Sequence, residues 1–174
     1  MRFVLGLVAG ILVFPVFAYL YINYGAPPVA TADEALPFER QITHIALDSR
    51  ILREAPKTAP IPANEETFLL GAQIYRADCM MCHGQPGKPS RFEKAMFPAP
   101  PQLWVAKRDH TGVSDDPPGE TYWKVRNGIR LSGMPSYKDM LDETQMWQVS
   151  LLLANADKPM PAAAQAELAK PPSD

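Results

Sequence analysis

The longest uninterrupted apolar stretch lies at the N-terminus of the sequence. Residues 3–22 contain no charged side chain and no Ser, Thr, Asn or Gln. A helix of about 20 residues is about 30 Å long, the thickness of the hydrocarbon core of a bilayer. Arg2 precedes the run, and tyrosines gather at its far end, as aromatic side chains do at membrane interfaces. The pattern predicts a transmembrane anchor over residues 1–24, with the rest of the chain outside the cytoplasm.

A cleaved signal peptide is the alternative for the same segment. Ala30-Thr31-Ala32 offers a small-x-small cleavage site. The apolar run, however, exceeds the about 7–15 residues of a signal core, and the site lies well beyond its end. We therefore favour an uncleaved anchor, and either alternative exports the rest of the chain. Gly6 and Gly10 form a GxxxG pattern that can pair membrane helices, although glycine is common in such helices.

Residues 25–63 have the pattern of a linker that contains one amphipathic helix. Prolines and alanines dominate both ends of this stretch. Between them, over about residues 38–55, four apolar side chains recur at helical spacing on one face. They are Phe38, Ile42, Ile45 and Leu52. The sequence leaves open whether this face packs on the following domain, on the membrane surface or on a partner protein.

A compact domain is expected over residues 64–158. Asn64 can cap a helix over residues 65–78, whose first turn carries two glutamates that the helix dipole favours there. Residues 84–118 are rich in proline and glycine, so we expect mostly loop in this region.

Two further helices are predicted in the second half of this domain. One lies near residues 119–127 and ends before Gly128. The other covers about residues 143–155, after a capping box in which Asp142 is followed three positions later by glutamine. Residues 159–174, rich in proline and alanine, are expected to form a flexible tail. No strand and no internal repeat is predicted.

The composition narrows the class of protein. The chain has 174 residues, which suits one domain with appendages, and its net charge of −2 is unlike that of a nucleic-acid binder. Its 19 prolines are roughly twice the usual share of about 5%, which predicts irregular chain and short helices. Two cysteines are too few for a disulfide scaffold or a four-cysteine metal site.

Both cysteines stand in the run Cys79-Met80-Met81-Cys82-His83. Two thiols at this spacing can each form a thioether with a vinyl group of one haem, and the adjacent histidine then lies beneath the iron. C-x-x-C-H is the attachment signature of c-type haem. Export agrees with this chemistry, because c-type haem is attached outside the cytoplasm. The pattern predicts one haem c, covalently bound through Cys79 and Cys82 and ligated by His83.

Three other roles of the cysteines are weaker. They are a plain disulfide or buried thiol pair, a thioredoxin-like redox dithiol, and a zinc site. The redox dithiol needs a βαβ setting, which this helix-and-loop pattern lacks. The zinc site would use both cysteines and one histidine, but it needs a fourth ligand for which no motif spacing is visible.

Met134 is the predicted second axial ligand of the iron. It stands in Gly133-Met134-Pro135, where glycine lets the backbone approach a flat ring and proline fixes the direction in which the chain leaves. A thioether is a soft ligand that favours reduced iron and raises the potential. The alternative is that Met134 is an ordinary core methionine.

The remaining candidate ligands are weaker for separate reasons. The two methionines inside the haem motif are too close to the histidine to reach the opposite face. Met140 and Met146 belong to helical patterns and are expected to pack. His44 lies outside the compact domain, and His110 is expected to be a solvated loop histidine.

Four stretches of residues 64–158 resemble, in order, a class I c-type cytochrome domain. They are GAQIYRADCMMCHG, PAPPQLW, YWKVRNGIRLSGMPSY and DETQMWQVSLLLANAD. The resemblance implies an all-α class I cytochrome c fold, with short helices and loops around one haem, here preceded by the N-terminal transmembrane helix. It also implies that the first and last helices of the domain cross, with Gly71 and Tyr75 on one and Trp147 and Leu151 on the other.

The resemblance further implies that a proline carbonyl after the haem motif accepts the Nδ1–H bond of His83 and so fixes the ring. Pro98, Pro100 and Pro101 all qualify, and the choice stays open.

Other residues near the motif are candidates for contacts with the haem or with a partner. Candidates for the haem walls or for partners of its propionates are Trp104, Trp123, Arg126 and Arg130, with Arg130 the best of them; for each of them, solvent exposure or simple packing is the favoured alternative. A basic rim that could steer an acidic electron partner comprises Lys88, Arg91, Lys94, Lys107 and Arg108.

A haem iron with both axial positions filled by the protein favours one-electron transfer over chemistry on a substrate. We therefore expect an electron carrier rather than an enzyme, at the periplasmic side of a bacterial inner membrane, with a single span. Its partners would be a membrane oxidoreductase, a terminal oxidase or a periplasmic dehydrogenase, with no nucleic acid and no small-molecule substrate. One alternative is a fixed haem c subunit of a respiratory oxidase or dehydrogenase complex. A weaker one is a haem peroxidase or gas-binding protein, which needs a displaceable sixth ligand.

Overall fold

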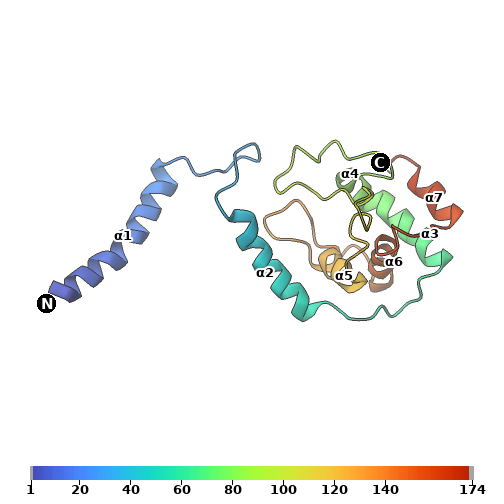
Figure 1. Cartoon of the computed structure of the whole chain (residues 1–174), viewed down its shortest axis with the longest axis horizontal. Coiled ribbons are helices and arrows are strands. Elements are labelled where there is room, and N and C mark those ends of the chain that lie inside the picture. The colour runs from blue at the N-terminus through green and yellow to red at the C-terminus, as the bar shows by residue number, and fades with distance from the viewer. Residues whose placement is uncertain (1, 173–174) are drawn as a thin grey trace. The chain divides into compact units, whose positions relative to one another are not determined.

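The computed structural model describes residues 2–172, and every regular element within them is helical (Figure 1). Two isolated β-bridges are the only strand-like pairings in that range. The chain divides into two compact units, Met1–Glu39 and Arg40–Asp174. The absence of strands in the described residues fits the predicted all-α fold, and the second unit holds the whole of the predicted domain.

The first unit contains the helix α1 (Arg2–Tyr24), which coincides with the apolar run of the sequence. Within residues 2–172, no helix satisfies both the length and the apolarity required for crossing a membrane. The helix itself is thus confirmed, whereas the anchor over residues 1–24 stays a prediction.

The helix α2 (Glu39–Glu54) confirms the predicted amphipathic helix. The four apolar residues of the predicted face are all exposed, so this face does not pack on the domain, and the buried residue of the helix is Ile51. The end of α2 lies against the helix α5 (Pro118–Asn127), where the Glu54 carboxylate accepts a 3.0 Å hydrogen bond from Trp123 Nε1. The Arg50 guanidinium lies 5.9 Å from the centroid of the same indole. Arg50 and Glu54, four residues apart on α2, therefore both contact Trp123.

The first helix of the domain is longer than predicted and continues to the histidine of the haem motif. It begins as α3 (Glu65–Ile74), with the Asn64 side chain accepting from the Thr67 amide at 2.9 Å as a predicted cap. It continues through a π-helical turn, η1 (Tyr75–Cys79), and a last turn, α4 (Met80–His83). A π-turn inserts an extra residue and rotates the side chains that follow, and such turns are frequent at functional sites.

The last predicted helix is α6 (Glu143–Leu153), and it packs across α3. Its capping box is confirmed, with Asp142 and Gln145 exchanging both hydrogen bonds. A Cβ at Gly71 would overlap the backbone carbonyl of Gln148, so only glycine permits this close crossing. Trp147 stacks on Tyr122 of α5 with ring centroids 4.3 Å apart. This contact joins α5 to the crossed helices α3 and α6.

The prediction of a flexible tail over residues 159–174 is wrong for the central part of this segment. The helix α7 (Ala162–Leu168) packs against α3 and buries Ala164 and Leu168. The Arg76 guanidinium forms a 2.6 Å salt bridge with the largely buried Glu167 carboxylate. Alanine is the best helix former, so an alanine-rich segment with two anchoring residues can fold onto the domain despite its flanking prolines.

A substitution in α7 tests whether this tail contributes to the fold. Leu168→Ala should lower the free energy of unfolding of the haem-loaded chain by about 2–4 kcal/mol, because it empties a buried site. Leu52→Ala is the matched control, since Leu52 is exposed on α2 and its loss should change stability by less than about 0.5 kcal/mol. Denaturant titration measures both. Equal, small effects of the two substitutions would show that α7 is loose in solution.

Candidate haem site

The haem motif occupies the end of the first helix, where η1 passes into α4. Cys79 and Cys82 are both half-buried free thiols and do not form a disulfide. Burial, followed by the nearby Asp78 and Cys82, raises the pKa of the Cys79 thiol to about 12. A redox dithiol works through a lowered thiol pKa, so this environment opposes that alternative. Two unpaired thiols at this spacing suit covalent attachment of a haem.

His83 is oriented by a hydrogen bond to the loop that follows it. Its Nδ1 lies 2.8 Å from the Pro101 carbonyl oxygen, which can only accept, so Nδ1 carries the proton and Nε2 keeps its lone pair. Burial lowers the pKa of His83, and the bond to Pro101 offsets this only in part. A neutral imidazole with one nitrogen fixed in this way is the form that ligates metal ions. Of the three prolines considered, Pro101 is thus the acceptor.

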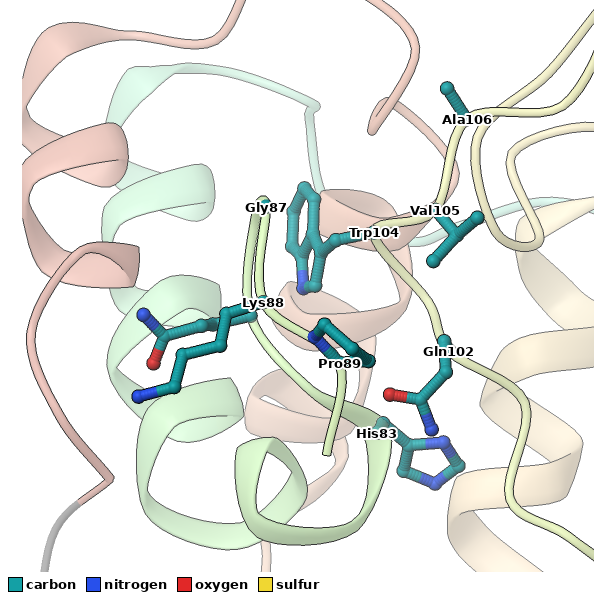
Figure 2. A pocket seen from close by; sticks show the side chains of 9 residues that line it. His83, Gly87, Lys88, Pro89, Gln102, Trp104, Val105 and Ala106 are labelled. Atoms are coloured by element: carbon teal, nitrogen blue, oxygen red, sulfur yellow. The ribbon is translucent and has the colours of Figure 1, made fainter. Parts of the chain in front are cut away.

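Gln102 holds this loop in place, a role that sequence reasoning missed. Its Oε1 accepts from the Ser90 amide at 2.7 Å, and its Nε2 donates to the carbonyls of Pro100 at 3.1 Å and Cys82 at 3.3 Å. Figure 2 shows the Gln102 amide close to the His83 ring. A glutamine directly after the proline run was the available signal, but nothing in its spacing showed which carbonyls it would meet.

Tyr75 closes the same region from the helix side. It is fully buried, and its hydroxyl donates a 2.7 Å hydrogen bond to the Gly84 carbonyl. Burial is also the main reason why its pKa lies far above the usual value for tyrosine. The segment around His83 is therefore held from both sides, by Tyr75 and by Gln102.

Met134 lies in a tight loop whose conformation is fixed by a glycine turn and by hydrogen bonds within the loop. Gly128 has a φ of 66°, and a Cβ there would meet the backbone of Pro135 and Ser136 at 2.7 Å. The Ile129 amide donates to the Met134 carbonyl at 3.2 Å. The Met134 side chain is half-buried and packs against the hydrophobic core, as Cys79 also does. The loop therefore presents a thioether to the same core that holds the haem motif.

Tyr137 connects this loop to the haem motif. Its hydroxyl donates a 2.8 Å hydrogen bond to the carbonyl of Asp78, the residue before Cys79, across 59 residues of sequence. Sequence reasoning missed this contact, because an aromatic residue after the methionine loop has several possible acceptors.

Trp104 provides the test of whether the residues present fit a haem. Its indole N–H is buried and makes no hydrogen bond of ordinary geometry in the described part of the chain, although it is close enough to the Tyr75 hydroxyl to lower the pKa of that group. The ring lines a cavity of about 270 Å³ together with His83 (Figure 2). A buried donor without an acceptor costs about 1–3 kcal/mol, so a ligand whose acceptor reached this N–H would stabilise the site. A haem propionate would be such an acceptor, His83 at the same cavity would hold the iron, and the two thiols, which lie outside the lining of this cavity, would attach the ring.

Trp123 donates to Glu54 of α2 instead of facing the haem motif. Arg126 and Arg130 are exposed, and their role as propionate partners stays a prediction. His110 lies between two carboxylates, with Nδ1 2.8 Å from Asp109 and Nε2 3.4 Å from Asp115.

The weaker candidate ligands Met140, Met146 and His44 can also be located in the structure. Met146 is buried in the core as predicted. Met140 is exposed, so its predicted packing role is wrong. His44 is exposed on α2.

The fold and the site together define a c-type cytochrome. Residues 66–151 match the family model described as cytochrome C oxidase, cbb3-type, subunit III. Neither the curated proteins nor the solved structures contain a match to this chain. Residues 66–151 thus belong to the c-type cytochromes, a class that binds haem covalently and transfers electrons.

Replacement of Trp104 tests the fit of the indole to the haem. Trp104→Phe should lower the stability of the haem-loaded protein by about 1.5–3 kcal/mol, the usual value of a hydrogen bond to a charged group. Thermal unfolding followed by the haem absorbance measures the change. If the indole N–H has no acceptor in the loaded protein, removing it would leave stability unchanged or raise it.

Proposed function

We propose that this protein is a one-electron carrier with a single haem c. Cys79 and Cys82 attach the haem, and His83 and Met134 are its axial ligands. The observation that carries the proposal is the hydrogen bond from His83 Nδ1 to Pro101, which leaves Nε2 free to bind a metal beside two unpaired thiols. The half-buried Met134, on a preset loop that packs on the same core, supports the choice of the second ligand.

Each part of the chain has a distinct task in this function. The bound haem supplies an iron that changes charge by one electron. Pro101 and Gln102 hold the imidazole in one orientation, and the methionine loop holds the thioether, so little rearrangement accompanies the charge change. The thioether favours reduced iron and raises the potential. With His83 and Met134 both bound, the iron would have no open position for a substrate, which disfavours the peroxidase or gas-binding alternative.

A fixed subunit of a respiratory complex is the second candidate. The match of residues 66–151 to a family described as an oxidase subunit favours this role. The chemistry at the haem is the same in both cases, and the difference lies in whether the chain stays bound to an oxidase or dehydrogenase.

We propose a location and redox partners for this protein, based on its sequence and its surface charges. The uncharged run over residues 3–22 would anchor the chain in a bacterial inner membrane, with the haem domain in the periplasm. The partners would be a membrane oxidoreductase, a terminal oxidase or a periplasmic dehydrogenase with an acidic docking surface. The basic residues that would meet it are all exposed: Lys88, Arg91, Lys94, Lys107 and Arg108.

Replacement of Met134 tests the ligand assignment. Met134→Ala should abolish the weak far-red band of the ferric form, lower the reduction potential and allow CO to bind the reduced iron. Met140→Ala is the matched control, because Met140 is exposed, and it should leave the spectrum as in the wild type. Absorption spectra and redox titration measure these effects. An unaltered spectrum in Met134→Ala would show that another residue is the ligand.

Removal of the N-terminal segment tests the proposed anchor. Replacing residues 1–24 with a cleavable export signal should release the haem protein from the membrane fraction into the soluble periplasmic fraction. Fractionation followed by haem staining measures the shift. Full-length protein in the soluble fraction would contradict the anchor.

Copurification from solubilised membranes distinguishes the carrier from the subunit. A stoichiometric oxidase that copurifies with this protein would favour the subunit role.

A further inference from the structure

Met96 makes a contact between two loops that the sequence gives no reason to pair. It is half-buried within the proline-rich loop that follows the haem motif. A Cβ built on Gly133 would overlap the terminal methyl group of Met96 and lie 3.9 Å from its sulfur. The thioether of Met96 therefore rests on the bare backbone of the residue directly before Met134.

The loop that carries Met134 has few ties to the rest of the chain at this point. The hydrogen bonds of residues 129–134 join the loop to itself: the Ile129 amide to the Met134 carbonyl, and Ser132 to both of these residues. Leu131 has a φ of 59°, a left-handed conformation that is uncommon for leucine, and its side chain is 91% exposed. Besides the packing of Met134 itself, the contact of Gly133 with Met96 links this loop to another segment.

The loop on the other side of the contact is firmly held. The Ser90 hydroxyl donates to the Met81 carbonyl, and the Ser90 amide donates to Gln102. The amides of Glu93 and Ala95 make turn hydrogen bonds within the loop, just before Met96. The same loop supplies Pro101, the acceptor for His83. Met96 thus extends from a segment fixed to the haem motif and reaches the segment that carries the proposed second ligand.

We propose that Met96 is a positioning residue that holds the methionine loop closed, by packing its thioether against Gly133. The proposal rests on the assignment of Met134 as the second ligand. Methionine suits this task because it is flexible and polarisable, so it fills an irregular gap between two loops. Gly133 suits it because a Cβ there would displace the terminal methyl group of Met96 from the backbone on which it rests.

Imidazole binding to the ferric, haem-loaded full chain tests this role. Imidazole can reach the iron only when Met134 is released, so its apparent affinity rises with the fraction of protein whose loop is open. Met96→Ala should raise that affinity about tenfold, a change of about 1.4 kcal/mol. Met96→Leu, which keeps most of the packing volume, should stay within about twofold of the wild type. The far-red band of the ferric form should persist in both variants.

Gly133→Ala gives an independent version of the test, because it displaces Met96 from the opposite side. It should raise the imidazole affinity by less than Met96→Ala does, because only the methyl end of Met96 must move, and added to Met96→Ala it should give no further increase, since both changes act on one contact. Hydrogen exchange gives a readout that does not involve the iron. The amides of residues 129–134 should exchange faster in Met96→Ala than in Met96→Leu.

Two results would overturn the proposal. One is an imidazole affinity and an exchange pattern in Met96→Ala that match the wild type, while Met134→Ala opens the iron. The other is loss of the far-red band in Met96→Leu, which would make the Met96 sulfur a ligand instead of a packing group. An unaltered spectrum in Met134→Ala refutes the ligand assignment without any Met96 variant, so the two claims fail separately.

Discussion

The hydrogen bond from His83 Nδ1 to the Pro101 carbonyl is the interaction on which the rest of the site depends. It fixes the tautomer of the imidazole, and burial keeps the ring neutral, so that Nε2 is available to a metal. To form it, the chain must turn back within 18 residues and place a carbonyl beside the ring it has just left. Prolines restrict the conformations of that loop, and Gln102 closes it with three hydrogen bonds. The prolines that follow the haem motif thus help to build a ligand environment mostly from loop.

The part of the site that carries Met134 must hold a thioether in place although no helix surrounds it. The loop of residues 128–134 achieves this with internal hydrogen bonds and a glycine turn. Tyr137 then ties the end of the loop to the carbonyl of Asp78, next to the haem motif. The two proposed ligands, distant in sequence, thereby belong to one packed unit together with the crossing of α3 and α6. Such preset geometry suits electron transfer, in which the site should change little between oxidation states.

Sequence reasoning predicted the features that are local in the chain. The haem motif, the Asn64 cap and the capping box at Asp142 each depend on residues a few positions apart, and the structure has both caps as predicted. Predictions from the sequence failed where the position of a side chain depended on tertiary contacts. The apolar stripe of α2 gave no hint that Ile51 would be buried or that Glu54 would accept from Trp123, 69 residues later in the sequence. The tail was predicted to be loose because the partner of Glu167 lies 91 residues away. Three prolines could accept from His83, and only the path of the loop decides among them.

The central claim is that His83 and Met134 are the axial ligands of one haem c. Proton NMR of the reduced, diamagnetic protein tests it most directly, because the ring current of the haem shifts protons held above the iron far upfield. With the methionine methyl groups labelled, the account predicts one three-proton signal well upfield of all others, which disappears in Met134→Ala. An upfield methyl signal that persists in that variant, or the absence of any such signal in the wild type, would contradict the account.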